Sequence, residues 1–384
     1  TSAGNYDISW YDEAKDSFSI STPAQLAGVA YLVKTGRTFE GKTVTLSGNI
    51  DLDGLKWEPI GKANLQQIFK GVFDGGGYEI HNLRSEVIST GEAYSGLFGA
   101  IYQARVTRVV LAEDCEIRTS YYGGGVVAYA QESEIVSCEN RASVSFEGPA
   151  GYVGGIAGYV STSSIDRCEN LGVVTGTVQP SDNYASCLVY TGGIAGVNQG
   201  ATIINNSNHA AVAVEALPEY DSCAGGIVGY NSGSSVAFIA NCYNAAGVRL
   251  SGAGFAGGIL SYTDNGDVRV ANCYNVGTVS GVPGKSYPIV PILSADSEDC
   301  YYLTNCVEGE GSYAGTALTV DYMKSTAFAA RLNDWSKTNN SSETGRQTLY
   351  WKVEDAENDG YPVFTDQDPG YTGVESVVSG VRIY

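Results

Sequence analysis

The chain has 384 residues and contains 49 glycines and 27 tyrosines but one methionine and two histidines, which is typical of strands and turns rather than helices. Its formal net charge of −20 at pH 7 disfavours nucleic acid and anionic membranes as partners, because both would be repelled by the whole molecule. No run approaches the ~18 apolar residues that span a bilayer, and no basic and apolar leader opens the chain, so we expect no transmembrane segment and no remaining signal peptide.

The first predicted element is a helix over about 22–35, within an N-terminal cap that spans residues 1–55. Thr22 followed by Pro23 is a helix start signal, and the apolar residues that follow have helical spacing. Because open sheet ends invite aggregation, a repeat structure needs such a cap.

The middle of the chain repeats one block five times: Ile or Val, two residues, Cys, one residue, Asn, one residue, Ala or Gly, one residue, Val. The copies occupy residues 135–144, 165–174, 203–212, 239–248 and 270–279. A second phrase, Gly-Gly followed by small and aliphatic residues, precedes each block and begins at Gly124, Gly154, Gly192, Gly225 and Gly257. Such a repeat predicts a solenoid in which each unit buries its apolar face against its neighbours.

Alternating apolar residues around each block predict short strands, and the glycines between them predict turns. We therefore expect an all-β parallel β-helix over residues 56–302, with three short strands in each coil and coils about 4.8 Å apart.

The cysteines occupy one repeat position in four copies, at Cys138, Cys168, Cys242 and Cys273. Equivalent positions stack in a solenoid, so these four predict a column of small buried thiols rather than bridges. Two disulfides stay open as alternatives, Cys300 with Cys306 and Cys187 with Cys223.

Two further columns follow from the repeat. The Asn residues of the five blocks predict an amide ladder at a left-handed turn, since Asn tolerates that conformation and its amide can pair with the coils above and below. Stacked rings are predicted for Tyr129, Tyr159, Tyr230 and Tyr262. Both columns favour a structural role over a binding stripe.

A C-terminal capping region is predicted over residues 303–384. Met323, Phe328 and Leu332 have helical spacing and predict a second capping helix over about 321–335.

The phrases SGLFG at 95–99, GGIAGY at 154–159 and GGIVGYN at 225–231, with NCYN at 241 and 272, resemble the GLUG-type repeats of bacterial surface proteins. The flanking stretches LSGNIDLDGLKWEPIG, FKGVFDGGGYEIHNL and GYPVF are similar to the same group. The resemblance implies a secreted, right-handed parallel β-helix of the adhesin-like kind that is abundant in Bacteroidetes. Such repeats also accompany immunoglobulin-cleaving metalloproteases, but this chain lacks the His-Glu-x-x-His helix of those enzymes. The final residues, 373–384, resemble the start of a sorting segment.

Parallel β-helices also include polysaccharide-cleaving enzymes, so the presence or absence of catalytic residues, rather than the fold, indicates whether this chain is an enzyme. The Asn-Thr-Asp, Asp-Asp and Gly-His-Gly runs of polygalacturonase-like sites are missing, and no coil position clusters carboxylates with Arg or Lys. The sequence therefore favours a protein without catalytic residues and without a cofactor.

Metal binding is weakly indicated. No Cys-x-x-Cys pair or Cys/His pair has the spacing of a zinc site. Asp355, Glu357, Asp359 and Asp366 partly imitate a calcium loop, but Pro362 interrupts it, so calcium stays open and no metal site is predicted.

The two longest insertions between repeats belong to adjacent coils and should emerge at one corner, and solenoid insertions often mark the binding face. We predict ligand-contact residues on these loops, tyrosines together with Asp, Asn or Glu, because the ring supplies contact area while the polar groups fix orientation. The predicted ligand-binding residues are Asp182, Asn183, Tyr184, Tyr190, Glu219, Tyr220 and Asp221.

Together these observations predict a non-enzymatic, secreted or cell-surface binding protein that recognises a host or dietary glycan, a mucin or a surface protein. The alternatives are a carbohydrate-active enzyme, either a polysaccharide lyase or a hydrolase, and a passive structural stalk. The sequence leaves the oligomeric state open.

Overall fold

The computed structural model describes residues 6–53, 56–89, 92–233, 236–264, 268–291, 296–308, 313–342 and 346–372. The predicted sorting segment at 373–384 lies outside them.

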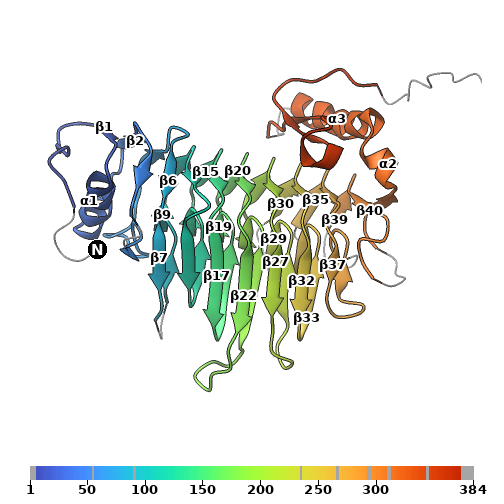
Figure 1. Ribbon diagram of the computed structural model, residues 1–384, viewed down its shortest axis with the longest axis horizontal. Helices are drawn as coiled ribbons and strands as arrows, with labels where there is room; N and C mark the ends of the chain where they lie inside the picture. The colour runs from blue at the N-terminus through green and yellow to red at the C-terminus, as the bar shows by residue number, and fades with distance from the viewer. Residues whose placement is uncertain are drawn as a thin grey trace, which may run out of the picture.

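The molecule is an elongated parallel β-helix with helices at both ends, which confirms the predicted fold class (Figure 1). Five parallel sheets, named A to E, run along the solenoid axis, and each complete coil visits them in the order A, B, C, E and D. The prediction of three strands per coil is wrong. The corners divide each coil into five strands, some only two residues long, and periodicity cannot resolve strands that short.

Sheets A and B contain ten strands each. Sheet A consists of β1 (Ser17–Ile20), β2 (Thr43–Leu46), β5 (Val72–Asp74), β10 (Arg105–Thr107), β15 (Glu134–Val136), β20 (Ser164–Asp166), β25 (Thr202–Ile204), β30 (Ala237–Ala240), β35 (Val268–Ala271) and β39 (Asp296–Glu298). Sheet B consists of β3 (Ile50–Asp51), β6 (Glu79–His81), β11 (Val110–Leu111), β16 (Glu139–Asn140), β21 (Glu169–Asn170), β26 (Ser207–Asn208), β31 (Tyr243–Asn244), β36 (Tyr274–Asn275), β40 (Tyr301–Leu303) and β41 (Thr316–Leu318).

Sheets C, E and D contain eight, seven and six strands. Sheet C consists of β4 (Lys56–Trp57), β7 (Arg84–Val87), β12 (Glu116–Thr119), β17 (Ser143–Gly148), β22 (Val174–Val178), β27 (Val212–Glu215), β32 (Val248–Ser251) and β37 (Val279–Ser280). Sheet E consists of β8 (Tyr94–Ser95), β13 (Tyr122–Gly124), β18 (Ala150–Gly154), β23 (Leu188–Gly192), β28 (Ser222–Gly225), β33 (Gly254–Gly257) and β38 (Ser286–Tyr287). Sheet D consists of β9 (Phe98–Tyr102), β14 (Val127–Gln131), β19 (Ala157–Ser161), β24 (Ala195–Gln199), β29 (Val228–Asn231) and β34 (Leu260–Thr263).

The sheets begin before residue 56 and continue past residue 302, because β1 to β3 and β41 already pair in parallel with the coils. Helix α1 (Pro23–Lys34) matches the predicted N-terminal helix, and the Thr22 side chain caps it by accepting from the amide of Gln25. Its Leu26, Val29 and Leu32 are buried in the main core. The helix therefore closes the first coil, as Figure 1 shows at the N-terminal end.

The block of the repeat supplies the core. Its first residue is fully buried in every copy, from Ile135 to Val270, and the four thiols of the Cys column are buried as predicted. Cys300 extends this column, since it comes next to Cys273, and all nine cysteines are free. Neither alternative disulfide forms. The register places Cys223 opposite Tyr190 rather than opposite Cys187.

The predicted amide ladder is present. The side-chain amide of Asn140 donates to Oδ1 of Asn170 at 2.9 Å, and the same bond continues at 2.8 Å through Asn208, Asn244 and Asn275. The left-handed residue, however, lies three positions earlier, at Ser137 in the first copy, with φ of 54°. The ladder Asn points inward with its amide bonded on both sides, so the turn falls at the preceding corner between sheets A and B.

The second glycine of each Gly-Gly phrase is required by this ladder. A Cβ built on Gly155 would lie 2.2 Å from the carbonyl oxygen of Gly193 and 2.3 Å from Cγ of Asn170. Only glycine lets the backbone pass this close to the buried amides.

The C-terminal region folds back over the last coils (Figure 1). The single helix predicted over 321–335 is instead two helices, α2 (Val320–Met323) and α3 (Thr326–Ser341), because the Ser325 side chain caps a new helix. They are followed by an antiparallel pair, β42 (Tyr350–Lys352) and β43 (Val363–Thr365), joined through the short helix η1 (Asn358–Gly360).

This cap covers an apolar part of the outer face of sheets A and B. Tyr243, Tyr274 and Tyr301 of sheet B are buried against Phe328 and Trp351. A second amide ladder, Asn205 to Asn241 to Asn272, lies under the cap and is bonded to it, with the Trp351 indole donating to Asn241 at 2.8 Å. The cap is therefore part of one folded unit with the coils.

Candidate functional site

The two predicted loops emerge at one corner of adjacent coils. Residues 179–187 join β22 to β23, and residues 216–221 join β27 to β28, so both connect sheet C to sheet E. They are the long loops at the lower edge of Figure 1. The position of the insertions was thus predictable, while their role in binding stays a prediction.

The first loop packs partly against the core of the coils. Asp182 and Asn183 are exposed, but Tyr184 is half-buried and packs against the main core. Tyr190 does not belong to the loop, because it lies within strand β23. The predicted residues of this segment are therefore divided between a loop tip and a sheet.

The second loop is tied to the coil after next. Glu219 and Tyr220 are exposed, and Asp221 accepts a salt bridge from Lys285 at 2.8 Å. The Lys285 ammonium also lies 4.7 Å from the centre of the Phe255 ring on sheet E. This loop therefore borders the outer surface of sheets E and D.

That surface carries two columns of aromatic side chains, which we name the tyrosine face. All of its members are partly exposed. The sheet E column consists of Tyr94, Tyr122, Tyr152, Tyr190 and Phe255, and the sheet D column consists of Tyr129, Tyr159, Tyr230 and Tyr262.

The stacking predicted for the sheet D column is confirmed. Tyr129 stacks on Tyr159 with ring centres 5.5 Å apart, and Tyr230 stacks on Tyr262 at 6.1 Å. The sheet E column was not predicted, although its residue stands two positions before the first glycine of each Gly-Gly phrase. Tyr122 there stacks on its neighbours at 5.0 and 5.2 Å.

The two columns meet edge to face. The rings of Tyr122 and Tyr129 are 5.6 Å apart and inclined by 76°. Val197 and Cys223 interrupt the columns, and here Tyr190 crosses to stack on Tyr230 at 4.3 Å. The result is a continuous aromatic lattice in which most ring faces contact other rings.

The phenols of the lattice are neutral. Burial raises the pKa of Tyr122, Tyr129, Tyr159 and Tyr230 above the ordinary value of 10. At neutral pH these four hydroxyls therefore keep their protons and can both donate and accept a hydrogen bond.

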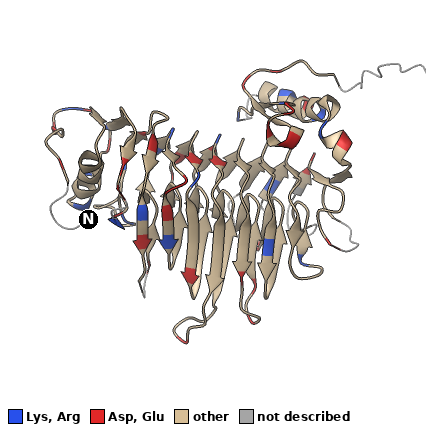
Figure 2. Cartoon of the chain, in the orientation of Figure 1, with Lys and Arg blue, Asp and Glu red and all other residues tan. Residues whose placement is uncertain are grey.

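The charged groups of the tyrosine face lie at its border rather than on its strands: Lys285 beside Phe255, Glu92 accepting from the Tyr94 hydroxyl at 2.7 Å, and Asp264 beside Tyr230. None of the strands of sheets E and D contains Asp, Glu, Lys or Arg, although 17% of the chain is charged. Charged pairs such as Arg84 with Glu116 lie on sheet C, and others lie on sheets A and B. Figure 2 shows basic and acidic residues scattered over the coils and the C-terminal cap, with uncharged stretches of strand between them.

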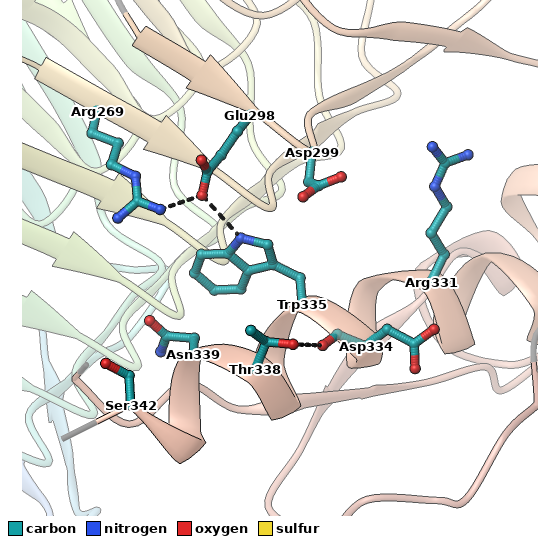
Figure 3. A pocket seen from close by; sticks show the side chains of 9 residues that line it. All are labelled: Arg269, Glu298, Asp299, Arg331, Asp334, Trp335, Thr338, Asn339 and Ser342. Atoms are coloured by element: carbon teal, nitrogen blue, oxygen red, sulfur yellow. Dashed lines mark hydrogen bonds and ion pairs between the residues drawn. The ribbon is translucent and has the colours of Figure 1, made fainter. Parts of the chain in front are cut away.

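A separate pocket of about 580 Å³ lies between α3 and the end of sheet A (Figure 3). The Trp335 indole donates to Glu298 at 3.3 Å, and Arg269 pairs with the same carboxylate. The Arg331 guanidinium lies 4.8 Å from the centre of the Tyr301 ring. These groups chiefly hold α3 against the coils, so the pocket is a secondary candidate. Sequence reasoning missed it because its two walls are over 30 residues apart.

A third candidate is a cleft of about 490 Å³ where β43 approaches sheet B. Nε2 of His209 lies 3.1 Å from Oε1 of Glu169 and 3.1 Å from the hydroxyl of Tyr243. Glu357 and Asn358 of the cap also line this cleft, as does Arg167. A carboxylate, an imidazole and a phenol in one cleft are groups that can transfer protons.

The partial calcium loop is otherwise engaged. Asp366 pairs with Arg167 at 3.3 Å, and Glu357 lies 3.8 Å from Lys352. Within the described ranges, no group of three or more His, Cys, Asp or Glu is placed to hold a metal ion. In the same residues, no helix has the length and apolar character needed to cross a membrane.

Comparisons with known proteins support the fold. No protein-family model matches the chain, and no curated protein matches it. A crystal structure from Bacteroides ovatus, provisionally assigned as an immunoglobulin A1 protease, superimposes with a TM-score of 0.53 at 19% identity, over 93% of this chain and 94% of that one. A second structure, described as an IgA1 protease, gives a TM-score of 0.46 at 14% identity and covers 95% of this chain but 26% of that one. The first likeness shows the β-helix fold and carries no activity to this chain.

Proposed function

We propose that this protein is a non-enzymatic, secreted or cell-surface binding protein of the adhesin-like kind, and that the tyrosine face with its two bordering loops is the binding surface. The resemblance of the repeats to the GLUG type is part of the same proposal. The observation that carries it is the double column of partly exposed aromatic rings on strands without charge.

The exposure of so many aromatic rings to water supports a binding role for this face. Soluble proteins rarely leave a large aromatic surface exposed, and tyrosine supplies much contact area with little side-chain entropy to lose. The loops add exposed polar groups at the border, where Asp182, Asn183 and Glu219 can fix the orientation of a ligand.

The test is binding of the intact chain to arrays of glycans, mucins and surface proteins. Two variants separate the parts of the surface: Tyr122→Ser with Tyr159→Ser in the face, and Tyr184→Ala with Tyr220→Ala in the loops. Ser145→Ala with Thr175→Ala on sheet C is the matched control. We expect the face variant to lose at least tenfold in affinity and the control to bind normally. If the intact chain binds nothing on the arrays, the proposal is wrong.

An enzyme that cleaves a polysaccharide is the second candidate, because Glu169, His209 and Tyr243 meet in one cleft. The chain would then release oligosaccharides from a polysaccharide panel, and Glu169→Gln would abolish that release. Products that form equally with Glu169→Gln would show that the cleft is not responsible.

A further inference from the structure

We infer that the ligand of the tyrosine face is an uncharged, linear polysaccharide that lies along the solenoid axis and contacts successive coils in register. This inference rests on the proposed binding function and adds the chemical class, direction and length of the ligand.

The shape of the face sets the direction. At ~4.8 Å per strand, the sheet E column extends over six strands, which is about 24 Å, and the sheet D column over five, which is about 19 Å. Across the strands the lattice is only two rings wide, with Tyr122 and Tyr129 centred 5.6 Å apart. An extended chain therefore contacts the most aromatic surface when it runs from coil to coil.

Charge sets the class of the ligand. The charged groups Glu92, Asp264 and Lys285 lie at the border of the face. A charged group that is desolvated against the middle of the face meets no opposite charge on the strands, so its burial there is unfavourable. The net charge of −20 repels polyanions as well. An average protein partner has about a quarter of its residues charged, which fits this face poorly. A neutral polymer avoids all three costs.

The exposed chemistry is hydroxyl-rich. The ring faces of Tyr122, Tyr152 and Tyr159 are occupied by stacking and edge contacts within the lattice. Ring edges and phenol groups are what such a lattice presents outward. A neutral sugar chain offers hydroxyls that both donate and accept, together with C–H groups that pack against the ring edges.

Repetition sets the length dependence. Successive coils present nearly the same ring and hydroxyl, so each additional sugar adds a similar contact to a ligand that is already bound. Affinity should rise with chain length until the ligand spans the columns, then level off.

The experiment uses the full chain and a panel of neutral polymers: dextran, pullulan, hydroxyethylcellulose, arabinoxylan and galactomannan. Affinity electrophoresis identifies the polymer that binds, and calorimetry follows its oligosaccharides from two sugars upward. We expect at least a tenfold gain in affinity between two and six sugars. A matched series then tests charge: dextran is compared with carboxymethyl-dextran and diethylaminoethyl-dextran, and any other polymer that binds is compared with its carboxymethylated form. We expect each charged derivative to bind at least tenfold more weakly than its neutral parent.

Conservative variants separate binding from folding. Tyr122→Phe with Tyr159→Phe keeps the stacked rings and removes two hydroxyls, so the thermal midpoint should stay unchanged while affinity falls about tenfold. Equal or tighter binding of a charged derivative, no gain with chain length, or no binding to any neutral polymer would each overturn the inference. Binding to a mucin or protein through the tyrosine face, with no neutral polymer bound, would overturn the inference but leave the proposed function standing.

Discussion

Removing one amide from the middle of the ladder tests the account of the fold most directly. Asn170 donates to Asn208 at 2.8 Å and to the carbonyl of Gly172 at 2.9 Å, and it accepts from Asn140 at 2.9 Å. In Asn170→Ala, the donor of Asn140 and the acceptor of Asn208 lose their partners in the core. Each buried polar group left unpaired costs about 1–3 kcal/mol, so we expect the free energy of unfolding to fall by about 2–5 kcal/mol.

The isosteric variant Asn170→Asp adds a pH signature. Its second oxygen would face the acceptors of Asn208 and Gly172, so burial and these oxygens favour the protonated acid and raise its pKa above the unfolded value of about 3.9. The folded state then binds more protons than the unfolded state. Relative to the unmodified chain, the variant should be least stable near pH 7 and regain stability as the pH falls through the raised pKa.

Denaturant unfolding followed by far-ultraviolet circular dichroism measures both variants between pH 4 and 7. Thr175→Ala, on the outer side of a neighbouring strand, should stay within about 0.5 kcal/mol of the unmodified chain. The reasoning fails if Asn170→Ala behaves like this control, or if the Asn170→Asp curve runs parallel to the unmodified chain at every pH.

Three further outcomes are expected. Gly155→Ala would place a methyl group against the backbone and the Asn170 amide, so the free energy of unfolding should fall by about 3 kcal/mol. A fall below about 1 kcal/mol in the same assay would contradict this contact. The hydrogen bond and charge of Asp114 raise the pKa of His81 above 6.5. Protonated His81 therefore contributes its full stabilisation below pH 6.5, and this contribution is lost as the pH rises through the higher pKa of the folded state. His81→Gln should therefore flatten that part of the stability profile, and an unchanged profile would exclude the pair. Trp351→Phe removes the indole donor to the second amide ladder and should expose the C-terminal cap to limited proteolysis, whereas unchanged cleavage would show that the indole does not secure it.

The sequence predicted what repeats at a fixed spacing. The columns at Cys138 and Asn140 and the two insertions follow from aligning the units, because equivalent positions in a solenoid must stack. The five-strand division of the coil was not predictable in this way. Sheet B strands of two residues carry no periodic pattern, and their corners depend on single left-handed residues such as Ser137.

The docking of the cap did have a sequence signal. The residue between Cys and Asn in the block is Glu139 and Glu169 in the first two copies, but Tyr243 and Tyr274 in the last two. This outward position changes from charged to aromatic where the cap begins to cover sheet B. What the sequence could not supply is the partner, since Trp351 reaches these tyrosines from over 70 residues away.

The molecule has two tyrosine-rich surfaces, one on sheet B and one on sheets E and D, and they differ in what covers them. On sheet B, outward rings at Tyr243, Tyr274 and Tyr301 are buried because the chain lays its own C-terminal segment over them. On sheets E and D, rings in the same stacked arrangement stay partly exposed, and the described residues place only loop borders beside them. Solubility alone would favour a polar column on those strands, as sheets A and C have with Arg105 and Glu116. Under the proposed function, an aromatic surface whose strands carry no charge and whose rings stay partly exposed is therefore better explained by a ligand that covers it than by the needs of the fold.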